Sequence, residues 1–277
     1  SYIDCLDRFH PKAPASDPSA RYGRGPYFKT RIAKPHGLRD VQRTFSRYGI
    51  KPQWLEEDLQ ALQPPDLILI TSLMTYWYTG VQETIAILRT FFPGTAIILG
   101  GIYASLCDKH AFKNAGADDI FCGPAEDALF DLITKYTHDR TTPRFNSQKL
   151  DTYPYPALDL QNHINYVPLL TSRGCPFKCT YCAAHFLNPI QMRRSPNSVL
   201  EEIKFWYQSY QVKDFVLYDD AFLVNAEQHA IPLLEKIIEA DIHLRFHTPN
   251  ALHIRGINTQ TAQLLFRAGF KTIRLGL

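Results

Sequence analysis

The chain has 277 residues, of which 45% are apolar and 21% charged, and its formal net charge at pH 7 is +3. This is an ordinary soluble composition, long enough for two domains or one large α/β domain with a buried core. No apolar run approaches the roughly 18 residues of a membrane span, and no charged-then-apolar leader resembles a signal peptide. We therefore expect a cytoplasmic protein.

The chain begins at Ser1 and reads as a strand over residues 2–6, and it reads as a strand again over residues 273–277. We expect it to be a fragment cut at both ends. Cys5, Cys107 and Cys122 are scattered through apolar surroundings. Buried free thiols in a reducing compartment explain them better than disulfides.

Positive charge is concentrated near the N-terminus. Between Arg8 and Lys51 there are eleven Lys or Arg and two acids, so this segment carries about +9 and the rest of the chain about −6. Residues 21–26 are also rich in Gly and Pro. The segment is interpreted as a solvated surface loop, with a loop over a phosphate-bearing ligand or a nucleic-acid arm as alternatives.

Residues 66–136 alternate between strand and helix patterns. Strands are predicted at 66–71, 95–99 and 118–122, and helices at 81–92, 104–113 and 126–136. This order predicts a parallel sheet covered by helices. Ligands of such sheets bind beyond the carboxyl ends of the strands.

A proline-rich strap over residues 137–166 is expected to pack across the first domain through Tyr153, Tyr155, Leu158 and Leu160. A second alternating series follows, with strands predicted at 167–172, 214–218, 243–247 and 272–276. Its helices are predicted at 198–210, 225–240 and 259–268. Repeated βα units of this length indicate a barrel or part of one, with active groups on the loops after the strands.

The most informative motif is CxxxCxxC, formed by Cys175, Cys179 and Cys182 directly after the first strand of the second series. Three thiolates in one short loop can close around a metal cluster. An iron–sulfur cubane normally takes four cysteines, so one iron would stay open for chemistry. The alternatives are a zinc site completed by His185 and an inert trio of cysteines.

This motif, with Tyr181 just before its last cysteine, resembles the signature of the radical S-adenosylmethionine (SAM) enzymes. The resemblance implies that the three cysteines hold a [4Fe–4S] cluster whose fourth iron binds SAM. An electron from the cluster would then cleave SAM to a 5′-deoxyadenosyl radical.

Other strand ends fit the same family. Asp219 and Asp220 follow the second barrel strand, where related enzymes often contact the SAM amino group, although the usual Gly-Gly-Glu is absent. Thr248 and Asn250 follow the third strand and could meet ribose hydroxyls. The alternatives are helix capping for the acids and turn formation at Pro249-Asn250.

The N-terminal half resembles the cobalamin-binding domain that precedes the barrel in one radical SAM subclass. Glycines would let the backbone approach the macrocycle, and the hydroxyls of Ser72, Thr75 and Ser105 would meet its amides and phosphate. The residues expected to contact cobalamin are Ser72, Leu73, Met74, Thr75, Tyr76, Gly100, Gly101, Ile102, Tyr103 and Gly123.

The Asp-x-His-x-x-Gly cobalt motif of many cobalamin proteins is absent: Asp108 and His110 begin like it, but Lys113 stands where Gly is needed. His10 and His36 are expected on the surface. The aromatic residues Tyr76, Trp77 and Tyr78 could instead be packing residues. A domain that binds another nucleotide, or nothing, is the competing interpretation.

The predicted fold is therefore α/β. It has a Rossmann-like cobalamin-binding domain over 1–136 with a basic insertion at 8–52, a linker at 137–166, and a truncated partial radical SAM barrel over 167–277.

The predicted function is methyl transfer to an unactivated carbon of an unknown substrate, with a [4Fe–4S] cluster, SAM and cobalamin as cofactors. No single catalytic residue is assigned. Alternatives are a radical rearrangement, cyclisation or oxidation, methylthio transfer to RNA, and a non-catalytic cobalamin- or metal-binding module. The expected partners are an organic substrate and a flavodoxin- or ferredoxin-like electron donor, with neither nucleic acid nor membrane.

Overall fold

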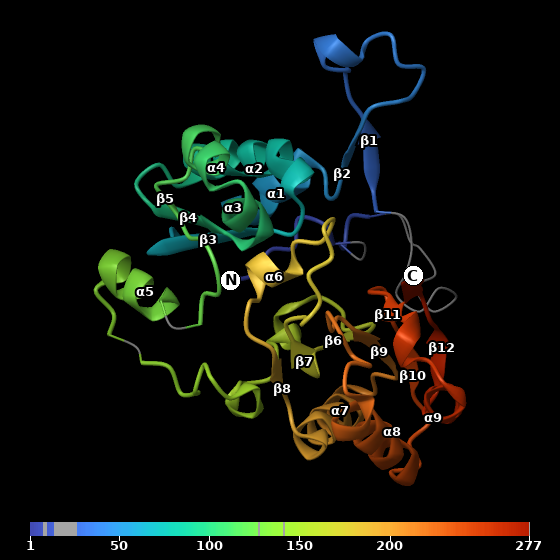
Figure 1. Cartoon of the computed structure of the whole chain (residues 1–277). Helices are drawn as coiled ribbons and strands as arrows, with labels where there is room; N and C mark the ends of the chain where they lie inside the picture. The colour runs from blue at the N-terminus through green and yellow to red at the C-terminus, as the bar shows by residue number, and fades with distance from the viewer. Residues whose placement is uncertain (8–9, 14–26, 127, 141, 277) are drawn as a thin grey trace. The chain divides into compact units, whose positions relative to one another are not determined.

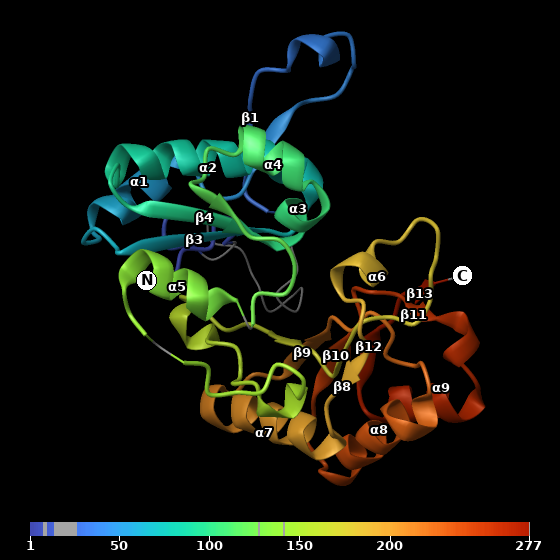
Figure 2. The same cartoon turned by 60° about the vertical axis from the view of Figure 1, so that its left-hand side comes forward.

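Two separate parallel sheets, each covered by helices, form the framework of the chain in a computed structural model (Figures 1 and 2). The structure describes residues 1–7, 10–13, 27–126, 128–140 and 142–276. The described chain divides into two compact units, the first ending at Thr142 and the second beginning at Pro143. The α/β class predicted from the alternating pattern is confirmed.

The first unit is built on a three-stranded parallel sheet. Its strands lie in chain order: β3 (Leu67–Ser72), β4 (Ala96–Gly100) and β5 (Asp119–Ile120). Helices α1 (Pro52–Gln60), α2 (Tyr78–Phe91), α3 (Gly101–Leu106) and α4 (Asp108–Asn114) precede or connect these strands, and α5 (Leu129–Thr137) lies on the opposite face from α1 and α2 (Figure 2). Because β4 is central and covered on both faces, its Ile97 and Leu99 are fully buried.

Two expected elements of this unit differ in the structure. The single helix predicted at 104–113 is two helices, because Cys107 has non-helical dihedrals (φ −133°, ψ 44°) between α3 and α4. Residues 2–6 form no strand, since Cys5 and Leu6 lie in a turn.

The expected burial of Cys122 also differs in the structure. Cys122 is exposed, because β5 ends two residues before it.

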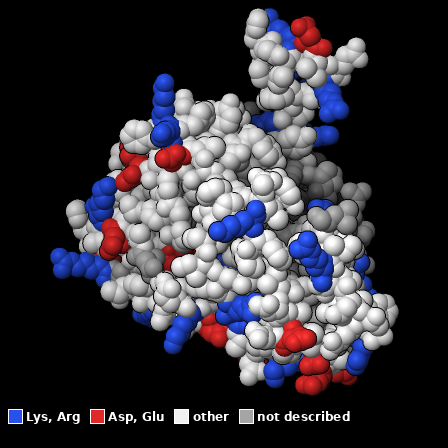
Figure 3. Space-filling model, in the orientation of Figure 1, with Lys and Arg blue, Asp and Glu red and all other residues white. Residues whose placement is uncertain are grey.

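The described part of the basic segment is a β-hairpin rather than a plain loop. Strand β1 (Lys29–Arg31) pairs antiparallel with β2 (Ser46–Tyr48), and a 3-10 turn, η2 (His36–Leu38), lies in the connection. Lys and Arg side chains line this arm, with Asp40 among them (Figure 3). The predicted Gly/Pro-rich stretch at 21–26 lies outside the described residues.

Phe28, next to β1, packs on Trp54 of α1 at 5.1 Å between ring centroids, and this contact anchors the base of the arm. His10 is buried, stacks on the Trp54 ring at 5.0 Å between centroids, and places Nε2 3.0 Å from an Asp58 carboxylate oxygen. The prediction that His10 is a surface residue was wrong, because this ring pair takes it out of water, whereas His36 is exposed as predicted.

The second unit is built on a four-stranded parallel sheet. Its strands also follow chain order: β6 (Val167–Leu169), β9 (Asp214–Leu217), β10 (Arg245–His247) and β12 (Phe270–Thr272). Helices α7 (Pro196–Tyr210), α8 (Ala230–Glu239) and α9 (Thr259–Arg267) connect them. Repeated βα units whose strands add in one direction are the arrangement of a partial barrel.

Two predicted strands of this unit are broken in the structure. Beyond β6 the chain turns away, and β7 (Ser172–Arg173) pairs antiparallel with β8 (Met192–Arg193). Beyond β12, the last strand β13 (Leu275–Gly276) pairs with β11 (Leu252–His253) instead of the main sheet. Only two residues separate β6 from β7 and β12 from β13, and one of the two is apolar in each case, so the sequence pattern merged each pair into one strand.

Apolar residues of the strands and the three helices form one core. The Phe215, Phe246 and Phe270 rings follow one another across neighbouring strands at 5.7 and 5.1 Å between centroids. Trp206 of α7 is 2% exposed in the same core. Burial of each large apolar side chain contributes about 1.5–3 kcal/mol.

The strap from Pro143 belongs to the second unit, so the prediction that it packs across the first domain was wrong. It holds two 3-10 turns, η4 (Leu150–Thr152) and η5 (Leu158–Leu160). Leu158 is buried in the core of the second unit, and the Tyr155 ring lies 5.3 Å from that of Phe205. In the described part of the chain, no helix combines the length and apolar character that crossing a bilayer demands.

Candidate functional site

The three cysteines of the motif lie on one loop at the carboxyl end of the second sheet. This loop, residues 174–183, joins β7 to the short helix α6 (Ala184–Leu187), and β7 continues the chain from β6. All six cysteines are free thiols; Cys175 and Cys179 are half-buried and Cys182 is exposed. The loop therefore stands where active groups of parallel barrels lie.

Gly174 starts the cysteine loop in a conformation that only glycine adopts without strain. Its φ is +84°, and a Cβ atom there would lie 2.6 Å from the carbonyl oxygen of Ile190. The segment that follows α6 thus passes directly over the beginning of the loop. This close approach explains why glycine stands between Arg173 and Cys175.

The thiols influence one another electrostatically. Burial raises the pKa of Cys175, the backbone N–H of Phe177 opposes this, and the charges of Asp220, Cys182 and Cys179 raise it further. Cys179 is also the main reason that the pKa of Tyr181 is raised. Because a cysteine must lose its proton to act as a ligand, binding of a metal at Cys175 would release this proton.

The donor set fits an iron–sulfur cluster, since thiolates are the ligands that such clusters take. Among the residues described, no three side chains of His, Cys, Asp or Glu lie close enough together to hold a metal ion. This also applies to a site made of the motif cysteines and His185. The cysteine ligands therefore remain a prediction from the motif. His185 packs on the Phe186 ring at 3.9 Å between centroids.

Asp219 joins the end of β9 to the strand that leads into the cysteine loop. Its carboxylate accepts hydrogen bonds from Thr171 Oγ1 (2.6 Å), Ser172 Oγ (2.6 Å) and the Thr171 N–H (3.2 Å). Asp219 is 5% exposed. Burial raises its pKa, while the hydrogen bonds from Ser172 and Thr171 act in the opposite direction.

Asp220 and Asn250 extend the same network. The Asp220 carboxylate accepts a hydrogen bond from the Gly174 N–H at 3.1 Å. The Asn250 side-chain amide donates to the carbonyl oxygens of Tyr218 (3.0 Å) and Asp219 (3.4 Å). Three of the residues predicted to contact SAM therefore meet at the base of the cysteine loop.

Thr248 and Tyr181 lie apart from this network. Thr248 is 1% exposed, its N–H donates to the Thr272 carbonyl, and its hydroxyl accepts from the Arg274 N–H. Tyr181 is 85% exposed. No contact described for either residue reaches Asp219, and their predicted roles toward SAM remain predictions.

Sequence reasoning missed Thr171, Ser172 and His229. His229 Nε2 lies 2.8 Å from Thr171 Oγ1, and all three residues are buried. Burial lowers the pKa of His229 to about 4, with a further contribution from Arg193. Two hydroxyl residues at the end of an apolar strand were a signal for Thr171 and Ser172, whereas nothing in the sequence marked His229.

In the first unit, the residues predicted to contact cobalamin gather at the carboxyl edge of the sheet. The loop after β3 leads into the 3-10 turn η3 (Thr75–Trp77), Gly100 and Gly101 join β4 to α3, and Gly123 follows β5. Ser72 forms a parallel bridge with Gly101, and the Gly123 N–H donates to Ser105 Oγ at 3.0 Å. Three chain segments thus converge as predicted from the strand ends.

The surface of this edge is apolar. Leu73, Met74 and Tyr76 are 55%, 37% and 69% exposed. Gly123 has φ +93°, and a Cβ atom there would meet no other atom within 4 Å. The exposed apolar side chains after β3 and the open space at Gly123 fit the binding of a bulky macrocycle.

Some of the predicted hydroxyls serve the fold. Ser72 Oγ donates to the Met74 carbonyl at 3.2 Å, and Ser105 accepts from Gly123 as described. Tyr103 is 1% exposed, and its hydroxyl lies 2.8 Å from Nδ1 of His110. The Tyr103 side chain is therefore part of the core of the first unit.

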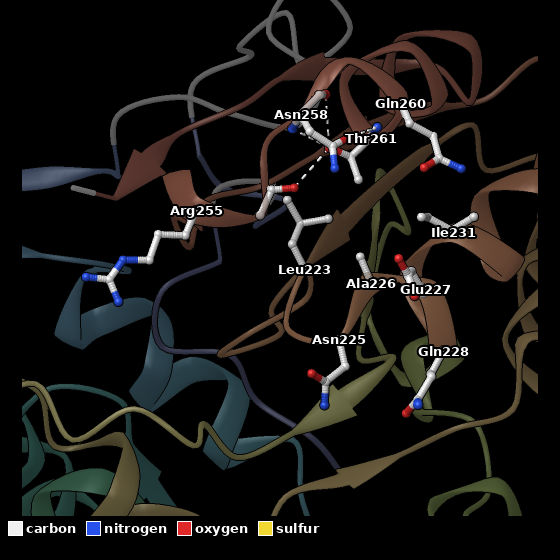
Figure 4. Close-up of a pocket in the computed structure, with 11 residues that line it drawn as sticks. Leu223, Asn225, Ala226, Glu227, Gln228, Ile231, Arg255, Asn258, Gln260 and Thr261 are labelled. Atoms are coloured by element: carbon white, nitrogen blue, oxygen red, sulfur yellow. Dashed lines mark hydrogen bonds between the residues drawn. The ribbon is translucent and has the colours of Figure 1, made fainter.

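The second unit also has an open groove of about 390 Å³ where α8 and α9 begin (Figure 4). One side is formed by η6 (Ala226–Gln228) and the other by the 3-10 turn η7 (Ile254–Gly256) with α9. Asn225, Gln228, Asn258 and Gln260 line it, and Arg255 extends away at one end. Its lining contains no Cys or His, so it supplies no ligand to the cluster.

Comparison with known proteins agrees with this geometry. A family model of the B12 binding domain matches residues 46–133, and one of the Radical SAM superfamily matches residues 169–277. An uncharacterized methyltransferase of Pyrococcus horikoshii is 27% identical over 77% of this chain and 51% of its own length. The anaerobic magnesium-protoporphyrin IX monomethyl ester cyclase of Cereibacter sphaeroides is 24% identical over 63% of this chain and 33% of its own.

The fold is shared with a solved structure. The radical SAM methyltransferase TsrM of Kitasatospora setae, with cobalamin and a [4Fe–4S] cluster bound, superposes with a TM-score of 0.65 at 19% identity. The match covers 81% of this chain and 52% of TsrM. The chain spans between a third and a half of the length of the curated relatives named above.

The two family models lie in the order that the two units have along the chain. Membership implies a [4Fe–4S] cluster, SAM and cobalamin as cofactors. The chain belongs to the radical SAM enzymes that carry a B12-binding domain before the barrel.

Proposed function

We propose that this protein is a cobalamin-dependent radical SAM methyltransferase that adds a methyl group to an unactivated carbon of an organic substrate. The observation that carries the proposal is the placement of three free cysteines on one loop at the carboxyl end of a parallel barrel sheet. The B12-binding domain in the same chain supports methyl transfer as the outcome.

When bound, the cluster supplies the electron that cleaves SAM, and cobalamin carries the methyl group. The residues of this chain hold and orient these groups. Cys175, Cys179 and Cys182 would ligate three irons. The exposed Leu73 and Met74, with the backbone at Gly101 and Gly123, would line the face on which cobalamin lies.

Asp219 and Asp220 support the cysteine loop from below. Their hydrogen bonds to Thr171, Ser172 and Gly174 fix the backbone that enters the loop. The cysteine ligands would then already lie near their binding positions before a cluster is bound. Hydrogen bonds that orient the ligands in this way strengthen a metal site.

A second candidate function is radical cyclisation. The similarity to the magnesium-protoporphyrin ester cyclase favours it, because that protein matches the chain over nearly as much length as the methyltransferase does. The two candidates share cofactors and differ in the fate of the substrate carbon.

The partners belong to the same proposal. A low-potential donor of the flavodoxin or ferredoxin class would reduce the cluster, and the substrate would be a small organic molecule rather than a nucleic acid or a lipid surface. The six free thiols support a reducing, cytoplasmic location.

Anaerobic reconstitution with iron and sulfide, followed by addition of SAM, hydroxocobalamin and a strong reductant, tests the proposal. We expect about four irons per chain, corrinoid absorption, and release of 5′-deoxyadenosine. Cys175→Ala should lose all cluster-dependent signals, while Cys122→Ala should keep them. Release of 5′-deoxyadenosine by Cys175→Ala, or wild-type protein that binds zinc and stays colourless, would contradict it.

The methyl group is followed separately. SAM with a deuterated methyl group should label bound cobalamin first and a candidate substrate next. Label that never leaves SAM, together with steady formation of 5′-deoxyadenosine, would favour cyclisation or another radical outcome.

A further inference from the structure

We propose that Asp219 and Asp220 are positioning residues for the cysteine loop. They hold the backbone on both sides of Arg173 and so fix the conformation of the loop before a cluster binds to it. The inference rests on the proposed function only in taking this loop as the cluster loop. It differs from the sequence-based expectation that both acids contact the amino group of SAM.

Asp219 is committed to the protein by its contacts. Oδ1 accepts from two hydroxyls at 2.6 Å each, and Oδ2 accepts from a backbone N–H at 3.2 Å. The side chain is buried, so these donors replace water as its partners. Because the donors belong to Thr171 and Ser172, the carboxylate fixes the turn between β6 and β7.

Asp220 acts two residues further along. Its carboxylate accepts from the Gly174 N–H, and a Cβ atom on Gly174 would lie 2.6 Å from the Ile190 carbonyl oxygen. Gly174 is therefore held by a hydrogen bond and by close packing immediately before Cys175.

Asp219 is itself held by further contacts. Asn250, after β10, donates to the carbonyl oxygen of Asp219, and His229 contacts the same Thr171 hydroxyl as Asp219. The ends of β6, β9 and β10 are thus joined beneath one loop. A network in which every member has a partner resists rearrangement more than its separate bonds would.

The negative charge has a consequence of its own. The Asp220 carboxylate accepts from the N–H of Gly174, the residue directly before Cys175. A negative charge fixed beside the cysteine loop disfavours an added electron on any cluster bound there. Asp220→Asn keeps an oxygen acceptor for the Gly174 N–H but removes the charge, whereas Asp220→Ala removes both.

The first test uses the protein without a cluster and therefore does not depend on the proposed function. Hydrogen–deuterium exchange is measured on peptides that cover residues 170–182 in the wild type, Asp220→Ala, Asp220→Asn and Asp151→Ala. Asp151 is the matched control, because its carboxylate accepts the Ser195 N–H at 2.8 Å outside the cysteine loop. We expect exchange in these peptides to rise about fivefold or more in Asp220→Ala.

Asp220→Asn should restore near wild-type exchange, and Asp151→Ala should leave this region unchanged while exposing the start of α7. Unchanged exchange in Asp220→Ala would overturn the proposal. Equal exchange in Asp220→Ala and Asp151→Ala across residues 170–182 would overturn it too, since the effect would then be a general loss of stability.

The second test uses the reconstituted protein. The reduction potential of the cluster, titrated by electron paramagnetic resonance, should rise in Asp220→Asn although its loop exchanges as in the wild type. An unchanged potential would overturn the electrostatic part of the inference. Absence of any cluster in the wild type, with the exchange results as expected, would refute the proposed function and leave the positioning role standing.

Discussion

His229 Nε2 lies 2.8 Å from Thr171 Oγ1 in the interior of the second unit. Thr171 has a single hydroxyl proton, which it donates to Asp219, so the hydroxyl oxygen accepts from His229. This arrangement assigns the proton of the neutral imidazole to Nε2. Burial and the nearby charge of Arg193 disfavour a second proton on this ring.

The first prediction is that His229 makes stability depend on pH. Its folded-state pKa of about 4 lies below the unfolded value of 6.5, so the unfolded chain binds more protons between these two pH values. The free energy of unfolding should therefore fall as the pH is lowered from 6.5 to 4, by up to about 3 kcal/mol. Urea titrations across this range measure it.

His229→Gln supplies the control, because its side-chain amide can still donate to Thr171 without titrating. The difference between wild type and variant should shrink at low pH. Asp219 has a raised pKa and contributes a slope of opposite sign, but it is present in both proteins and cancels. Parallel pH profiles would show that His229 is not buried as a neutral ring.

The second prediction separates the motif cysteines from the others. Alanine at Cys175, Cys179 or Cys182 should each abolish a stable [4Fe–4S] cluster after reconstitution, because two thiolates cannot hold it. Alanine at Cys5, Cys107 or Cys122 should leave the iron content unchanged. Iron and sulfide analysis of the six variants measures this, and equal losses in both groups would disprove the assignment.

The third prediction concerns Gly174. Gly174→Ala should destabilise the protein by about 2 kcal/mol or more, because φ is positive and the new Cβ atom meets the Ile190 carbonyl. Gly80→Ala, in the first turn of α2 with open space around it, should be neutral or stabilising by about 0.5 kcal/mol. Denaturant midpoints report both changes, and similar midpoints would contradict the close approach.

The fourth prediction contrasts two glycines of the cobalamin face. A Cβ atom on Gly101 would lie 2.4 Å from Thr71 Oγ1, whereas one on Gly123 would meet no protein atom within 4 Å. Gly101→Ala should therefore weaken folding and cobalamin binding together.

Gly123→Ala should cost only its backbone strain, about 1 kcal/mol, yet weaken cobalamin binding by a larger factor. Equilibrium titration with hydroxocobalamin, beside thermal unfolding without it, separates the two effects. Unaltered affinity in Gly123→Ala would place cobalamin elsewhere on this unit.

Much of the fold was predictable because it depends on local patterns. The apolar run at 66–71 and the helical spacing from Val81 to Phe92 are both present in the structure, with small shifts of their ends. Helix α1 was not predicted, although Pro52 at its start and the spacing of Leu55 and Leu59 are a helix signal.

The sequence by itself predicted a cluster at the cysteine loop and determined the order of the βα units, since ligand spacing and hydrophobic periodicity are properties of neighbouring residues. Only the tertiary structure decided what Asp219, Asp220 and His229 contact. The hydrogen-bond partners of these three side chains lie 46 to 58 positions away in the chain. The register between strands sets such contacts. Because the groups are buried, breaking one of these hydrogen bonds would leave a polar atom without a partner and lower the free energy of unfolding.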